Sequence, residues 1–144
     1  MILSCNFEEL GALRQGARAV LGEGPGEGAQ LVAPVVAPPE GREEVEGLLP
    51  RLSGDLAIET LAEQRLVFKA VSAIVSFLRD EMDLFIVSAQ PADEAAVSSY
   101  FAFAHALAVQ ARLAEMGQEM EALIEVVTGA PPTPEVAARF LFPG

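Results

Sequence analysis

Apolar residues in the middle of the chain recur every three or four positions, which is the spacing of one face of an α-helix. Thr60 and Glu63 form a capping-box pattern, so we expect this helix to begin after Thr60 and to end near Val87. One face is predicted to carry Val67, Val71, Ile74, Leu78, Met82 and Phe85, and a neighbouring face Phe68, Val75 and Ile86. A helix with two apolar faces must be buried on two sides.

A second long helix is predicted after the turn at residues 89–92, where Pro91, Asp93 and Glu94 suit a first helical turn. Gly129 and the prolines that follow end it near Thr128. Apolar residues wrap around much of its first half. Its second half shows alternating spacings of four and three, a coiled-coil-like seam formed by Val109, Leu113, Met116, Met120, Leu123 and Val127. We therefore expect close packing against another helix.

Shorter elements are predicted on either side of these two helices. A helix begins at Asn6, where Glu9 completes a capping box, and ends before Gly22. A second short helix spans Glu40–Leu49, and a last one runs from Thr133 to about Phe140. Alternating or valine-rich runs predict strands at Met1–Cys5, Gln30–Ala37 and Asp55–Glu59.

These elements predict an α+β fold within a single domain, residues 1–144. Residues 1–59 would form a small sheet of two or three strands with short helices. Residues 60–144 would form a long antiparallel helix hairpin followed by the short C-terminal helix. The alternative is an all-α bundle with an irregular N-terminal extension.

The charge of the chain narrows the range of partners. The 144 residues carry a formal net charge of −12, and the acidic residues are spread along the whole length. Such a surface repels phosphate backbones and anionic membranes, so we expect neither nucleic acid nor a membrane as a partner. The longest apolar run, Leu66–Leu78, is too short to span a bilayer. With no positively charged segment at the N-terminus, the expected location is the cytoplasm.

The residues with reactive side chains offer few combinations that could form a catalytic site. Cys5 is the only cysteine, and His105 is the only histidine. No acidic residue lies three or four positions from His105, so a helix would not pair it with a carboxylate. The glycine-rich segment 22–28 lacks the lysine and hydroxyl residue of a phosphate-binding loop. We therefore predict no catalytic residue and no cofactor.

Pairs of glutamates on the second long helix are the remaining candidates for chemistry. Glu115 and Glu119 are four positions apart, as are Glu121 and Glu125, and metal-binding bundles use such pairs when they point into the core. Most of these glutamates fall off the predicted apolar seam. A solvated acidic face is the simpler interpretation. A third acidic group, at residues 80–83, lies near the end of the first long helix.

The sequence favours a non-enzymatic interaction or structural module that forms an oligomer or joins a larger assembly, with itself or another protein as the partner. Two helices alone cannot cover apolar faces that wrap this far. The predicted contact residues are Tyr100, Phe101, Phe103 and Leu107, together with Met116, Met120 and Leu123 on the seam. One alternative is a small-molecule domain with an apolar pocket between hairpin and sheet. A metal-dependent hydrolase that uses the helical carboxylates is another.

Overall fold

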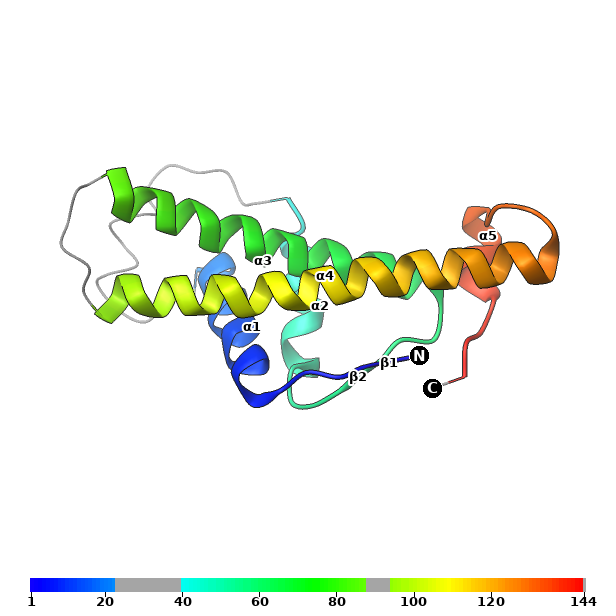
Figure 1. The fold of residues 1–144 in the computed structure, drawn as a ribbon, viewed down its shortest axis with the longest axis horizontal. Coiled ribbons are helices and arrows are strands. Elements are labelled where there is room, and N and C mark those ends of the chain that lie inside the picture. Colours follow the sequence, from blue (N-terminus) through cyan, green and yellow to red (C-terminus); the bar gives the residue numbers. More distant parts are fainter. Residues whose placement is uncertain (23–39, 88–93, 144) are drawn as a thin grey trace.

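The computed structural model describes residues 1–22, 40–87 and 94–143, and for residues 85–87 and 94–96 it describes the backbone alone. Helices dominate it (Figure 1). The described elements are β1 (Ile2–Leu3), α1 (Phe7–Val20), α2 (Arg42–Leu48), the 3₁₀ turn η2 (Leu49–Arg51), β2 (Leu56–Ala57), α3 (Leu61–Val87), α4 (Glu94–Thr128) and α5 (Pro134–Arg139). The predicted strand Gln30–Ala37 and the predicted turn at 89–92 lie outside the described residues.

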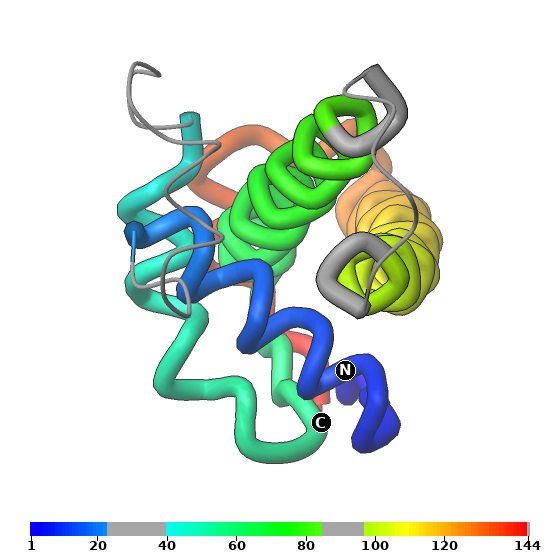
Figure 2. Tube along the Cα trace, turned by 90° about the vertical axis from the view of Figure 1, so that its left-hand side faces the viewer, coloured from blue at the N-terminus to red at the C-terminus, as the bar shows by residue number. Residues whose placement is uncertain are grey.

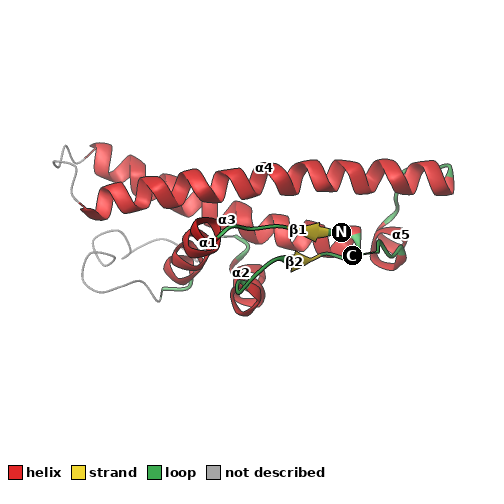
Figure 3. Ribbon diagram, turned by 60° about the horizontal axis from the view of Figure 1, so that its bottom comes forward, coloured by secondary structure: helices red, strands yellow, loops and turns green. Residues whose placement is uncertain are grey.

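Helices α3 and α4 pack side by side and antiparallel, which confirms the predicted hairpin (Figure 1). α1 contacts both of them, α2 packs on α3, and α5 returns against α3. Figure 3 shows α1, α2, α5 and the strands on one side of α4.

The sheet is smaller than predicted. β1 and β2 pair antiparallel over two residues each, with Ile2 opposite Ala57 and Leu3 opposite Leu56. β1 ends early because the chain turns at once into the cap of α1, where the Asn6 side chain accepts a hydrogen bond from the Glu9 amide at 2.7 Å. The α+β label is therefore right only in part. The described residues form a mainly helical structure with one minimal antiparallel sheet.

One core joins the N-terminal and C-terminal parts of the chain. Leu13 and Ala17 of α1 are fully buried, as are the predicted inward residues Val71, Ile74 and Leu78 of α3. Gly16 brings α1 close to α3, because a Cβ at this position would collide with the side chain of Ile74. Residues 1–59 thus share their core with the hairpin.

The inward line of α4 differs from the predicted seam. Val109, Leu113 and Met120 are fully buried as expected, but Leu123 is 40 % exposed and Val127 is 67 % exposed. The buried line continues through Gly117 and Ile124 instead. A strict repeat of 3.5 residues per turn drifts around a straight helix, whose period is 3.6, and α4 follows the straight helix.

Candidate functional site

The outward side of α4 is the first candidate site. On the inward side of this segment Ala102, Ala106 and Val109 are buried, yet apolar residues also line the opposite side. Every member of this second group is exposed, and together they span about 120° of the helix. We call this surface the outer α4 face; it consists of Val97, Tyr100, Phe101, Ala104, Leu107, Ala108 and Ala111. Figure 2 views the hairpin along its length and shows that α1, α2 and α3 lie away from one side of α4.

Two aromatic rings dominate one end of the outer α4 face. Tyr100 and Phe101 are each 57 % exposed, and their rings meet edge to face with centroids 6.2 Å apart. The other end is lined by small side chains, Ala108 and Ala111. Val97, Phe101, Ala104, Ala108 and Ala111 follow spacings of four, three, four and three, the repeat by which one helix packs against another. The face therefore has the form of a helix-packing surface.

The outer α4 face lacks charge. Residues 97–111 contain no aspartate, glutamate, lysine or arginine, although 21 % of the chain is charged. Charge returns on the same side of the helix at Glu115 and Glu119, both of which are exposed. A solvated helix surface normally carries charged residues, and a stretch without them is typical of a surface that becomes buried.

The structure separates the predicted contact residues into two groups. Tyr100, Phe101 and Leu107 lie on the outer α4 face, whereas Phe103 is half-buried against the core. On the seam, Met116 is half-buried, Met120 is 0 % exposed and Leu123 is exposed. Met120 therefore belongs to the internal core, and a partner cannot reach it in this conformation. The alanines of the outer α4 face were not predicted as contact residues; the uncharged stretch around them was the signal that could have revealed them.

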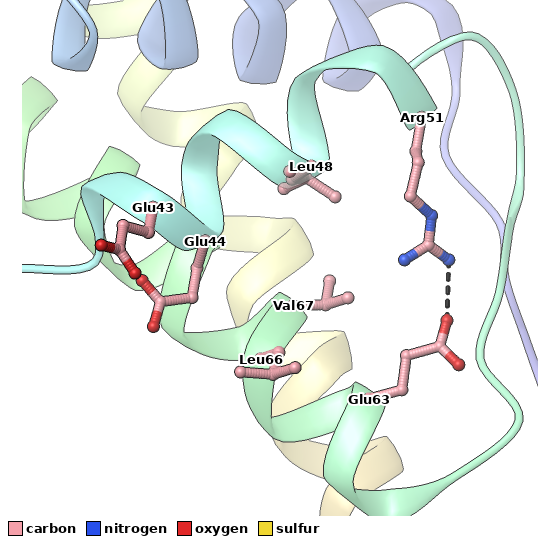
Figure 4. Close-up of a pocket in the computed structure, with 8 residues that line it drawn as sticks. Glu43, Glu44, Leu48, Arg51, Glu63, Leu66 and Val67 are labelled. Atoms are coloured by element: carbon pink, nitrogen blue, oxygen red, sulfur yellow. Dashed lines mark hydrogen bonds and ion pairs between the residues drawn. The ribbon is translucent and has the colours of Figure 1, made fainter.

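A shallow groove between α2 and α3 is the second candidate site (Figure 4). Its volume is about 370 Å³. Leu48, Leu66 and Val67 supply apolar lining, and three glutamates surround them. The lining residues are Glu43, Glu44, Gly47, Leu48, Arg51, Glu63, Leu66 and Val67. This groove lies between two helices and is rich in carboxylates, unlike the predicted apolar pocket between hairpin and sheet.

Ion pairs occupy part of that groove. Glu63 binds Arg51 at 2.8 Å, as the dashed line in Figure 4 shows, and Glu44 binds Lys69 at 3.1 Å. The Lys69 ammonium lowers the pKa of the Glu44 carboxyl through their hydrogen bond. Exposed pairs of this kind contribute little to stability. These pairs neutralise two of the three carboxylates that line the groove, so they leave no cluster of unpaired carboxylates there to bind a cation.

Glu9 and Arg112 form a partly buried, bidentate ion pair that joins α1 to α4. The guanidinium of Arg112 donates to both carboxylate oxygens of Glu9, at 2.7 and 2.8 Å, and to the backbone oxygen of Ser4 at 2.8 Å. Hydrogen bonding from Arg112 lowers the pKa of the Glu9 carboxyl, and the amide of Asn6 adds to this effect. The pair fixes the N-terminal segment against the hairpin.

Cys5 lies beside this ion pair. Burial raises the pKa of its thiol, and the nearby Arg112 charge only partly opposes that effect. A thiol whose pKa is raised stays protonated, whereas a nucleophilic cysteine needs a lowered pKa. The position of Cys5 therefore fits a packing role.

The predicted acidic candidates do not converge on one point. Glu115, Glu119 and Glu125 are exposed, and Glu121 pairs with Arg65 at 3.4 Å. His105 is half-buried, one helical turn away from Phe101. Among the described residues, no group of three histidine, cysteine, aspartate or glutamate side chains is placed so that it could hold a metal ion.

Comparison of the chain with protein-family models, with curated proteins and with solved structures returned no match. Within the described ranges, no helix combines the length and the apolar character needed to cross a membrane.

Proposed function

We propose that this protein is a non-enzymatic interaction module that self-associates by packing the outer α4 face against an α-helix of a second copy. The observation that carries the proposal is the uncharged stretch 97–111, whose outward side is apolar and exposed, in a chain of net charge −12. Exposure of this apolar surface to water is unfavourable, and burial against a partner removes the surface from water. The cytoplasmic location expected from the sequence remains part of the proposal.

The size of the outer α4 face suits a protein partner. Two half-exposed aromatic rings, Val97, Leu107 and three exposed alanines leave apolar surface on the order of 500 Å². Stable interfaces bury about 800 Å² on each partner, with a polar rim around an apolar centre. Tyr100 and Phe101 would supply the aromatic anchors that usually dominate binding energy.

A second copy of the chain is a better occupant than a nucleic acid or an anionic membrane. The net charge of −12 on the chain repels all three. A second copy alone among them offers an uncharged apolar face with a matching helical repeat. Contact through the outer α4 faces places the least charged part of each copy at the interface.

The alternatives receive less support from the described residues. The groove between α2 and α3 is shallow, and its ion pairs compete with any ligand. On α4, Glu115, Glu119, Glu121 and Glu125 are exposed at separate places, and of the acidic group at residues 80–83 only Glu81 is half-buried. Neither arrangement favours a small apolar ligand or metal-dependent hydrolysis.

Replacing Phe101 by glutamate tests the proposal, because it places a charge at the centre of the aromatic end of the outer α4 face. We expect the wild-type chain to sediment as a dimer and the Phe101→Glu variant as a monomer, with the helical circular dichroism unchanged. Val126→Glu is the matched control. Val126 is 81 % exposed on the same helix but lies beyond the face. A Phe101→Glu variant that dimerises as tightly as the wild type would overturn the proposal.

A further inference from the structure

We infer that two copies pair through their outer α4 faces in an antiparallel, two-fold arrangement, with Ala104 of one copy opposite Ala104 of the other. This inference rests on the proposed self-association and specifies its geometry. It follows from two gradients along α4, one in side-chain size and one in charge.

Side-chain size decreases along the outer α4 face. Val97, Tyr100 and Phe101 lie before Ala104, and Ala108 and Ala111 lie after it. With the helices antiparallel about Ala104, Tyr100 lies opposite Ala108 and Val97 lies opposite Ala111. Tyr100 and Val97 then each meet a small side chain, as close packing requires, and Phe101 lies opposite Leu107.

In a parallel pairing with the same register, each side chain would face its own counterpart in the second copy. The rings of Tyr100 and Phe101 would meet their own copies and push the helices apart. Ala108 and Ala111 would then face each other across a gap and lose their packing contacts. Leu107 would face its own copy in the parallel arrangement, whereas it lies opposite Phe101 in the antiparallel arrangement. The size gradient therefore selects the antiparallel arrangement.

Charge changes along the same side of α4. Beyond Ala111 this side carries Glu115, Glu119 and Glu125, all exposed. A parallel pair would align these glutamates with their own copies, and like charges at short distance repel. The antiparallel pair sends the two acidic halves to opposite ends of the dimer. It also opposes the two helix dipoles, which is a small additional gain.

The other described helices leave one side of α4 open. In Figure 2, α1, α2 and α3 lie away from that side, so no described helix among these three obstructs an approach from it. An exposed alanine at the axis allows two helices to approach to about 8 Å. Because each face pairs with itself, the contact closes at two copies and does not propagate into a filament.

Cysteine pairing tests the arrangement. In a Cys5→Ala background, Val97→Cys and Ala111→Cys variants are prepared separately with tags of different mass, mixed, allowed to exchange and oxidised. A disulfide needs Cα atoms within about 7 Å of each other. We expect the mixed Val97→Cys/Ala111→Cys disulfide as the main product, and little product from either variant alone.

Two outcomes would overturn the arrangement while sparing the proposed function. Disulfides between two Val97→Cys chains would show a parallel pair. A dimer by sedimentation that forms no disulfide in any mixture would place the axis elsewhere. Failure of the proposed function itself is distinct, because the wild-type chain would then sediment as a monomer before any cysteine is introduced.

Discussion

Gly16 and Gly11 occupy the same helix, α1, but only Gly16 lies against a neighbouring element. A Cβ at Gly16 would collide with Ile74 and crowd Leu78, which are both fully buried in α3. We expect Gly16→Ala to lower the free energy of unfolding by about 1–3 kcal/mol, because the core is overpacked at a point that cannot yield easily. Chemical denaturation followed by circular dichroism measures this change.

The matched control is Gly11→Ala, because nothing lies within 4 Å of a Cβ at that position. Alanine is the better helix former by about 1 kcal/mol, so this variant should be at least as stable as the wild type. Equal effects at the two positions would show that α1 does not approach α3 as closely as described.

The carboxylate of Glu9 links stability to pH. Hydrogen bonding from Arg112 holds its folded-state pKa below the ordinary value of 4.5. The ion pair therefore stabilises the fold above that value, and its contribution is lost as the pH falls through the folded-state pKa. We expect Glu9→Gln to cost about 1–2 kcal/mol at neutral pH. The cost should shrink as the pH falls below 4.5 and through the folded-state pKa, because the wild-type carboxyl then also becomes neutral.

Glu8→Gln is the control for this pH effect. Glu8 is exposed in the same first turn of α1, so both substitutions remove one carboxylate near the N-terminus of the helix. Unfolding curves at neutral and acidic pH should show a larger pH-dependent difference for Glu9→Gln than for Glu8→Gln. An equal dependence in both variants would mean that Arg112 contributes nothing through Glu9.

At the scale of the elements, α3 and α4 meet through a buried polar contact. The side-chain amide of Gln64 on α3 donates to the backbone oxygen of Leu113 on α4 at 2.7 Å. Gly117 makes room for it, because a Cβ there would lie 2.6 Å from the amide nitrogen. Gly117→Ala should therefore displace Gln64 and leave a buried amide unpaired, a cost of about 1–3 kcal/mol that outweighs a gain of about 1 kcal/mol in helix propensity.

A double-mutant cycle isolates this contact. In a Gln64→Ala background the obstructing amide is gone, so Gly117→Ala should become neutral or stabilising. Equilibrium unfolding of the four proteins measures the coupling. Additive effects of the two substitutions would contradict direct contact between Gln64 and position 117.

Local chemistry made the helix boundaries predictable. The Asn6 and Glu9 capping box forms as expected, and the amide of Glu63 donates to the Thr60 hydroxyl at 3.0 Å. The Glu63 carboxylate instead accepts from the amide of Glu59, one residue earlier than the pattern implies. Such contacts lie within a few residues of each other, so the sequence contains nearly all the information that determines them.

Which residues of α4 face inward depends on contacts that are distant in the sequence. The heptad spacing predicted Leu123 and Val127 as inward, but the line of burial passes through Gly117 to Ile124. Gly117 has no side chain to mark it as a core position, and its importance depends on Gln64, which lies far away in the sequence. Residue spacing alone could not show this.

At the scale of the whole molecule, α4 carries apolar residues on two opposite sides between Val97 and Ala111. The sequence predicted Tyr100, Phe101 and Leu107 as contact residues, and they are exposed. It also predicted Met120, which is buried. Periodicity shows that two sides are apolar, but only the packing of α1 and α3 determines which side remains outside.

The molecular mass in solution is the most direct test of self-association through the outer α4 face. It is measured by size-exclusion chromatography with light scattering over a wide concentration range. Salt at about 0.15 M limits the range of charge repulsion between copies to about 8 Å. We predict a mass that approaches twice the 15.2 kDa of one chain as the concentration rises. A constant mass of 15.2 kDa at every concentration would contradict the central claim.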